Sequence, residues 1–485
     1  MLFNSIDFAI FLPTVFLIYW FITNKNLKLQ NCFIVFASYI FYGWWDWRFL
    51  SLLLCSTVID YTVGVKLQNE HKANKRKRLL WISLLVNLGI LGFFKYCNFF
   101  LENFVTAFSF FGTNIPTGSL NIILPVGISF YTFQTLSYTI DVYRRKLKPT
   151  RDFIAFAAFV SFFPQLVAGP IERATHLLPQ FYSKRIFDEP KAVNGMRQIL
   201  WGLFKKIVIA DNCAQFANLF FNNSQDYSGS TLVLGALFFS FQIYGDFSGY
   251  SDIAIGTARL FGFDLKQNFN FPYFSRDIAE FWRKWHISLS TWFRDYLYIP
   301  LGGSRCITGK KIRNIFIIFL VSGFWHGANW TFIAWGGLNA IYFLPLFLTN
   351  KNRTYLDVVA QGKYFPTLKE IISISSTFML TVFAWIFFRA ENMSHAASYI
   401  TEIFSTSLFT IPEFSGKRDA LKVLLLVASF LIVEWLGRES QYAIEKISNI
   451  LKHQFFRWTF YIFVLIVIYF SGNFSKSIEF IYFQF

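Results

Sequence analysis

The stretch "RNIFIIFLVSGFWHGANWTFIAWGGLNAIYFLPLFL" (313–348) decides the class of fold. It is apolar along its whole length except near His326, where "WHGANW" interrupts the run. A helix needs about 20 mostly apolar residues to cross a bilayer, so the stretch has room for two helices, one on either side of the interruption. The sequence therefore predicts a pair of membrane helices that meet at His326.

The rest of the chain has the same composition. Of 485 residues, 54% are apolar, 21% are aromatic and only 15% are charged, whereas soluble proteins carry about 25% charged residues. We expect an all-α polytopic membrane protein with about 11–12 transmembrane helices in a single domain, 1–485. Irregular, re-entrant or interfacial segments are expected at 153–181 and 276–305. The other predicted spans lie near 6–23, 31–65 (two spans around "GWWDW"), 79–101, 122–143, 207–222, 231–258, 371–388, 421–436 and 457–474.

The net charge of +17 is concentrated in short basic clusters between the apolar runs, at 71–78, 144–151 and 309–313. This is the pattern of cytoplasmic loops under the positive-inside rule, and it argues against nucleic-acid binding. It also predicts that 102–121 lies outside and that the N-terminus lies outside. The five cysteines are odd in number and contain no CxxC pair, so neither a disulfide framework nor a metal site is indicated.

His326 is the first candidate catalytic residue. If its helix begins near Arg313 at the inner face, thirteen residues at about 1.5 Å each carry the chain roughly 20 Å into the membrane. Gly323 and Gly327 allow tight turns and close approach at this point, and the tryptophans of "WHGANW" could form walls. A neutral imidazole there could accept a proton near pH 7. The alternative is a histidine that only hydrogen-bonds across helices.

Two further clusters could carry chemistry or serve structure alone. His286, in "FWRKWHISLS", would share a helical face with Trp282 and Leu289, either packing at the interface or acting beside His326 in positioning or proton relay. In "QIYGDFSGYSDIAIG" (242–256), Asp246 and Asp252 lie among glycines and serines that could satisfy buried carboxylates, and a structural role is favoured over direct catalysis.

The loop "LGGSRCITGKKIR" (301–313) is the candidate cofactor-binding segment. Its glycines and the basic residues Arg305, Lys310 and Lys311 could hold the phosphates of a cytoplasmic cofactor. The same basic residues are also explained by positive-inside anchoring, which is the favoured interpretation.

Several motifs together resemble the membrane-bound O-acyltransferase (MBOAT) family. The chain is most similar to the bacterial branch that O-acetylates alginate or peptidoglycan, and more distantly similar to the teichoic-acid D-alanylation member. The resemblance covers nearly the whole chain. It rests on "DIAEFWRKWHISLSTWFRDYLYIPLGGSR" (277–305), "SGFWHGANWTFIAWGGLNA" (322–340), "GFFKYCNFF" (92–100), "LPVGISFYTFQTLSY" (124–138), "FFPQLVAGPI" (162–171) and "GDFSGYSDIAIG" (245–256).

The resemblance implies a ring of helices around a thin central floor with a tunnel. It implies that His326 is the catalytic histidine and that His286 is at the family's second characteristic position. Acetyl-CoA would be the cytoplasmic donor, because a charged nucleotide cannot cross hydrocarbon but an acetyl group can pass a narrow pore. The sequence has no GxSxG elbow and no outer domain for a glycan-esterase triad, so a separate extracytoplasmic acetyltransferase would acetylate the glycan. A protein in the inner membrane that acetylates a cell-envelope polysaccharide is therefore expected, with a transporter or flippase of a lipid-linked glycan as the alternative.

The aromatic C-terminal tail (475–485) ends in "FIYFQF". It resembles the FxYFxF ending of envelope acylation systems in this family, in which the tyrosine is thought to receive the acyl group. Tyr482 is the corresponding residue, and the expectation is that the tail folds back so that Tyr482 takes the acetyl group near His326. The alternative is an aromatic anchor in the outer interface.

Overall fold

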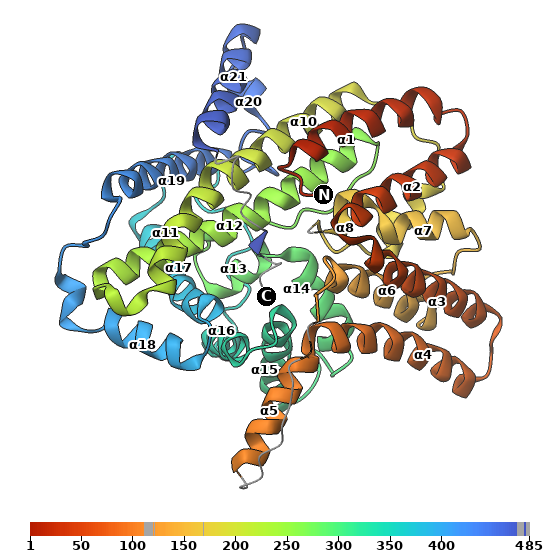
Figure 1. Cartoon of the computed structure of the whole chain (residues 1–485), viewed down its shortest axis with the longest axis horizontal. Helices are drawn as coiled ribbons and strands as arrows, with labels where there is room; N and C mark the ends of the chain where they lie inside the picture. The colour runs from red at the N-terminus through yellow and green to blue at the C-terminus, as the bar shows by residue number, and fades with distance from the viewer. Residues whose placement is uncertain (111–119, 121, 168, 473–479, 482–485) are drawn as a thin grey trace. The chain divides into compact units, whose positions relative to one another are not determined.

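The computed structural model describes residues 1–110, 120, 122–167, 169–472 and 480–481, with the side chain of residue 110 left out (Figure 1). The predicted helical class is confirmed, since these residues contain helices and loops but no β-strand. The chain divides into two compact units, residues 1–195 with 257–266 and residues 196–256 with 267–485. The contacts described below each lie within one unit.

Seven helices among the described residues are long and apolar enough to cross a membrane. The larger predicted number was based on apolar runs, and some of these runs fold as shorter pieces. The run near 207–222, for example, is divided between η5 (Phe204–Ala210) and α11 (Asp211–Asn222). The predicted ring, floor and tunnel stay predictions. The seven are Leu27–Asn69 and Ala73–Ser109, each of which joins consecutive helical elements, and Gly229–Leu260, Trp330–Leu348, Leu368–Arg389, Lys417–Gly437 and Gln454–Ser471.

In the first unit, three helices pack around a buried polar cluster. The Asp60 carboxylate on α3 (Leu50–Asn69) accepts hydrogen bonds from Asn87 on α4 (Ala73–Leu91) at 2.8 Å, from Thr139 on α6 (Ile128–Tyr143) at 3.0 Å and from Ser83. Such bonds are needed because a buried carboxylate without partners is strongly unfavourable. The helices of this unit are α1 (Ile6–Leu17), η1 (Ile18–Ile22), α2 (Leu27–Asp46), η2 (Trp47–Phe49), α3 (Leu50–Asn69), α4 (Ala73–Leu91), η3 (Gly92–Tyr96), α5 (Cys97–Phe110), α6 (Ile128–Tyr143), α7 (Phe153–Ser161), α8 (Phe163–Leu166), α9 (Ala174–Leu177), η4 (Leu178–Phe181) and the first part of α10 (Glu189–Leu203).

Two sequence expectations are met in this unit. The 31–65 run is interrupted at "GWWDW", because α2 ends at Asp46 and α3 begins at Leu50 after the short turn η2. The 153–181 segment is irregular as predicted, with four short helical pieces that are mostly buried within the unit. Burial in protein is the condition under which irregular backbone is tolerated at membrane depth.

The second unit contains both candidate histidines. It includes the long helix α12 (Gly229–Leu260), of which residues 229–256 belong to this unit, and the helix pair α15 (Thr308–His326) and α16 (Trp330–Leu348). The remaining elements are the end of α10, η5, α11, η6 (Ser224–Asp226), η7 (Pro272–Phe274), α13 (Ile278–Lys284), α14 (Ile287–Phe293), η8 (Arg294–Tyr298), α17 (Leu368–Arg389), α18 (Met393–Ile403), η9 (Thr406–Phe409), α19 (Lys417–Gly437), α20 (Ile447–Ile450) and α21 (Gln454–Ser471).

Helices α15 and α16 lie side by side as the predicted pair (Figure 1). Glycines bring their backbones together: a Cβ atom on Gly323 would lie 2.1 Å from the Phe332 carbonyl oxygen, and one on Gly336 would lie 2.3 Å from the Phe319 carbonyl oxygen. Helix α15 begins at Thr308 rather than near Arg313. Its 19 residues correspond to about 28 Å of helix, so α15 is longer than the thirteen residues, or roughly 20 Å, that the sequence suggested.

Candidate functional site

His326 is the last residue of α15, and 5% of it is exposed. Its imidazole meets the rings of Trp335 and Phe388 edge to face, each at 5.3 Å between centroids. Trp385 stacks on Trp335 at 5.6 Å. Walls for this site thus come from α16 and α17, whereas Trp330 of the "WHGANW" stretch is 55% exposed. His326 is therefore enclosed by aromatic rings from the two helices α16 and α17.

Gly327 explains why the helix stops at the histidine. The backbone becomes extended at this residue, and a Cβ atom there would lie 2.0 Å from the Phe332 ring. Only glycine leaves the space that this ring fills. The chain then turns into α16, where the Asn329 side chain accepts a hydrogen bond from the Thr331 N–H as an N-cap. The local sequence "HGAN" thus fixes the imidazole at the junction of the two helices.

His286 is not on a continuous interfacial helix, as the sequence suggested. Helix α13 ends at Lys284, Trp285 is extended, and His286 has a left-handed backbone with φ of 43° before α14 begins. Left-handed backbone is unfavourable for a residue with a Cβ atom and is often found at functional sites. The imidazole is 3% exposed, and its ring lies 4.6 Å from that of Phe247, edge to face.

Asn268 causes this break and also holds the imidazole. Its backbone carbonyl accepts the Ile287 N–H at 2.9 Å, and its side-chain oxygen accepts the Ser288 N–H at 3.2 Å. These are first-turn amides of α14, which have no partner within the helix. Nothing in the pattern around Asn268 pointed to this role, because its partners lie 18–20 residues further along the chain.

The Asn268 contacts also determine which nitrogen of His286 carries the proton. A backbone N–H can only donate, so the side-chain atom that faces the Ser288 N–H is the amide oxygen. The same oxygen lies 3.1 Å from His286 Nδ1. Nδ1 must therefore carry hydrogen and donate, and in the neutral ring Nε2 is left as the acceptor.

The two histidines belong to one aromatic cluster within the second unit. Trp285, the neighbour of His286, packs 5.1 Å from Trp385, and Trp385 stacks on Trp335, which contacts His326. Burial lowers the pKa of His286 well below its usual range, and the positive form of His326 lowers it further. The structure thus brings the two predicted histidines into one electrostatic environment and keeps His286 neutral.

The acidic residues of α12 serve the structural role that was favoured. Their partners are two adjacent lysines of η5 rather than the helix serines. Lys205 Nζ lies 2.5 Å from an Asp252 oxygen, and Lys206 Nζ lies 2.8 Å from an Asp246 oxygen. The Tyr244 hydroxyl donates to Glu434 at 2.6 Å nearby. These ion pairs lie inside the protein, so Lys205 and Lys206 do not form a basic cluster on its surface.

The C-terminal segment returns into the second unit at Phe480 and Ile481. These two residues are 0% and 1% exposed, and the Ile481 N–H donates to an Asp246 carboxylate oxygen at 2.7 Å. Tyr482, the predicted acyl acceptor, lies outside the described residues. An interfacial anchor would leave the aromatic ring of Phe480 at the surface, so the burial supports the expectation that the tail folds back.

The predicted cofactor loop lies between η8 and α15. Gly302 and Gly303 have positive φ angles of 106° and 54°, and Arg305 and Lys310 are exposed. Exposed charges suit either phosphate binding or membrane anchoring. The cofactor role of Arg305, Lys310 and Lys311 therefore stays a prediction.

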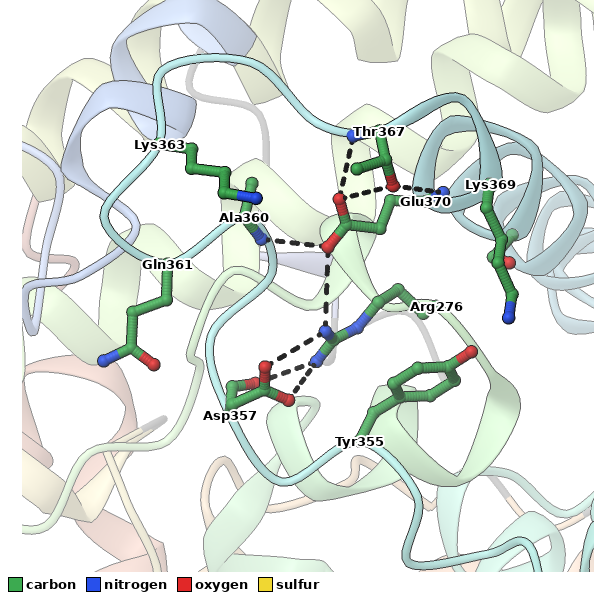
Figure 2. A pocket seen from close by; sticks show the side chains of 10 residues that line it. Arg276, Tyr355, Asp357, Ala360, Gln361, Lys363, Thr367, Lys369 and Glu370 are labelled. Atoms are coloured by element: carbon green, nitrogen blue, oxygen red, sulfur yellow. Dashed lines mark hydrogen bonds and ion pairs between the residues drawn. The ribbon is translucent and has the colours of Figure 1, made fainter.

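A separate polar pocket of about 340 Å³ lies beside the loop that precedes α17 (Figure 2). The Arg276 guanidinium donates to Glu280 at 3.0 Å and to Asp357 at 3.0 Å, and it lies 3.9 Å from Glu370. An anionic ligand would have to compete with three carboxylates for this one guanidinium. The arrangement is thus a clamp that holds the loop onto α13.

Comparison with known proteins identifies the family. Residues 39–354 match MBOAT, the membrane-bound O-acyltransferase family. The chain is 39% identical over 444 residues to the probable alginate O-acetylase AlgI of Pseudomonas aeruginosa, covering 91% of this chain and 82% of that protein. It is 39% identical over 427 residues to the peptidoglycan O-acetyltransferase of Helicobacter pylori, covering 82% and 78%.

A more distant match is the teichoic acid D-alanyltransferase of Bacillus subtilis, at 28% identity over 299 residues, which cover 57% of this chain and 71% of that protein. The first two similarities extend over most of both chains, and the family match includes the elements that carry both histidines. Together with the seven apolar helices, they establish a multi-pass membrane enzyme: the chain belongs to the membrane-bound O-acyltransferase family.

Proposed function

We propose that this protein moves acetyl groups from cytoplasmic acetyl-CoA across the inner membrane for O-acetylation of an extracytoplasmic cell-envelope polysaccharide. The names of the relatives, an alginate O-acetylase and a peptidoglycan O-acetyltransferase, support this substrate class. The observation that carries the proposal is the pair of buried histidines in one aromatic cluster. A transporter of lipid-linked glycans does not need such a pair.

His326 is the general base in this proposal. Its imidazole removes the proton from the acceptor hydroxyl, and the oxygen attacks the thioester carbonyl carbon. The carbon–sulfur bond then breaks, and the thiol of CoA leaves with the proton. General-base catalysis of this kind is typically worth 10²–10⁴-fold in rate. The rings of Trp335 and Phe388 enclose the imidazole, which limits the water that could hydrolyse the thioester.

His286 has a positioning role in the same reaction. Because Nδ1 donates to Asn268, Nε2 can accept a hydrogen bond from the acceptor hydroxyl or from a water molecule. The low pKa that burial gives this imidazole prevents it from becoming a cation beside His326. Two cations at one buried site would repel each other.

Tyr482 is proposed as the first acceptor of the acetyl group. A phenol ester is nearly as activated as a thioester, because the pKa of phenol is about 10 and that of a thiol is about 8.5. A separate extracytoplasmic acetyltransferase then takes the acetyl group and passes it to the polysaccharide. Arg305, Lys310 and Lys311 are proposed to bind the phosphates of acetyl-CoA on the cytoplasmic side.

The test uses the purified protein in detergent with acetyl-CoA labelled in the acetyl group. Release of CoA and transfer of label to the protein are expected, and both should disappear in His326→Ala. His453→Ala is the matched control, because this exposed histidine lies in a loop before α21. Absence of both transfer and hydrolysis, together with glycan transport in vesicles, would reject the enzyme in favour of a transporter.

A further inference from the structure

The C-terminal segment is held at one defined place on α12. The Ile481 N–H donates to Asp246 Oδ2 at 2.7 Å. The ring of Phe480 lies 4.3 Å from that of Tyr250 and 6.1 Å from that of Phe247. These three α12 residues fall within five consecutive positions and so lie on neighbouring turns of the helix. We define Asp246, Phe247 and Tyr250 as the tail seat.

The surroundings of Asp246 favour its hydrogen bond with the Ile481 N–H. Its other oxygen, Oδ1, pairs with Lys206 Nζ at 2.8 Å, and the side chains are 3% and 1% exposed. Lys206 also pairs with Asp211 at 2.9 Å. A buried carboxylate of this kind favours N–H donors, and such charge-assisted bonds are stronger than neutral ones.

The tail seat is continuous with the surroundings of His286. Phe247, which lies next to Asp246 in the chain, meets the His286 ring edge to face at 4.6 Å. Tyr482 follows Ile481 directly in the sequence. Whatever fixes Ile481 therefore limits where Tyr482 can reach.

We propose that Asp246, held by Lys206, anchors the C-terminal segment through the Ile481 N–H and so positions Tyr482 for acetyl transfer. The positioning role rests on the proposed function of Tyr482, whereas the anchor does not. Asp246 is a positioning residue because it acts through the tail and not on the acetyl group. Asp252 has a different task on the same helix, since it pairs with Lys205 and accepts a hydrogen bond from Gln198.

The experiment compares Asp246→Asn with the matched control Asp252→Asn in the full-length protein in detergent. Carboxypeptidase trims the C-terminus, and intact-mass spectrometry follows the products. In the wild-type protein and in Asp252→Asn, trimming should stop while Ile481 is still attached to the chain. In Asp246→Asn, removal of Ile481 and Phe480 should be about tenfold faster or more, because the hydrogen bond to a charged carboxylate becomes a weaker bond to a neutral amide oxygen.

A second pair of variants avoids any change in the ion pairs of α12. Ile481→Pro removes the amide hydrogen and leaves Asp246 and Lys206 intact, whereas Ile481→Val keeps the hydrogen. Release of the tail in Ile481→Pro but not in Ile481→Val is expected. Equal protection of the tail in Asp246→Asn, Ile481→Pro and their controls would overturn the anchor.

Acetyl transfer to the extracytoplasmic partner is measured on the same variants. Asp246→Asn and Ile481→Pro should slow transfer at least tenfold, with the KM for acetyl-CoA unchanged, whereas Asp252→Asn and Ile481→Val should not. Full transfer by the tail-released variants would overturn the positioning role. Full transfer by Tyr482→Phe would instead reject the proposed function of Tyr482 and leave the anchor in place, so the two failures are distinguishable.

Discussion

Substitution of Asn268 tests how the site works, because its side-chain oxygen has two roles. It accepts an amide N–H at the start of α14, and it determines the tautomer of His286. This oxygen accepts from the Ser288 N–H, from the Ser288 hydroxyl at 2.9 Å and from His286 Nδ1. Asn268 is fully buried. In Asn268→Leu the Ser288 N–H and the His286 Nδ1–H lose their acceptor, at about 1–3 kcal/mol each. The expected loss of stability is therefore about 2–6 kcal/mol, enough to obscure any catalytic effect.

Asn268→Asp is the informative variant. It has the same shape and still accepts all three hydrogen bonds, but it places a negative charge about 3 Å from the imidazole, by the spacing in the native protein. An adjacent anion favours the protonated ring and so raises the pKa of His286. The rate of acetyl transfer should stay near that of the wild-type protein at pH 8.5. It should fall about tenfold for each pH unit once His286 becomes protonated.

The assay is the pH dependence of transfer from labelled acetyl-CoA between pH 5.5 and 9. The wild-type profile should show no inflection from His286 in this range, since burial keeps its pKa well below 6.5. In Asn268→Asp, an acid limb should appear at least about one pH unit higher than in the wild-type protein. Asn270→Asp is the control, because it adds a charge to the same segment and its backbone N–H bonds to Lys284. An Asn268→Asp profile that matches the wild-type profile would refute the role of Asn268 in setting the state of His286.

Four further predictions follow from the same contacts. His326→Ala should lower acetyl transfer at least 100-fold at unchanged expression, and retention of more than a tenth of the activity in the radiolabel assay would exclude it as the base. Tyr482→Phe should block glycan acetylation, measured on the isolated polysaccharide, while the protein remains abundant; full acetylation would leave the tail as an anchor only. When the pH falls from 7.5 to 5.5, His286→Asn should lose about 1.4 kcal/mol less stability than the wild-type protein loses. Here the unfolded histidine takes a proton below about 6.5 and the buried one does not, so stability falls with pH; equal thermal shifts in detergent would contradict this. Gly323→Ala should destabilise by about 1–3 kcal/mol because its Cβ atom would meet the Phe332 carbonyl, whereas Gly337→Ala, with 3.7 Å to its nearest neighbour, should be nearly neutral in the same melting assay.

The local sequence pattern was sufficient to predict those structural features that depend on residues close together in the chain. The apolar run on each side of "WHGANW" predicted the pair α15 and α16, and the glycines predicted their close approach. The break at "GWWDW" was predicted for the same reason, since a charged residue between aromatic runs does not suit a continuous span. His326 was predicted as the catalytic residue because it lies at such a break in the sequence, and that role stays a prediction.

Features that depend on distant partners were not predictable in this way. Lys205 and Lys206 have the pattern of a basic cluster at a membrane edge, but their carboxylate partners on α12, Asp252 and Asp246, are about 40–47 residues further along the chain. The 276–305 stretch has the composition of one amphipathic helix. It is divided at His286 because Asn268, from an earlier segment, satisfies the first amides of α14. No local periodicity contains this information.

In the proposed reaction, the positions of the two histidines relative to their helices favour different tasks for them. His326 is the last residue of the 19-residue helix α15, where the carbonyl ends of the peptide dipoles favour positive charge, by about 0.3–1 kcal/mol at exposed sites and more when partly buried. His286 stands at the start of α14, where the dipoles disfavour positive charge, and burial acts in the same direction. A proton from the acceptor hydroxyl is therefore better held on His326 than on His286. Because the charge of His326 lowers the pKa of His286, the arrangement supports a single proton-accepting site, and His286 remains free to orient the hydroxyl through Nε2.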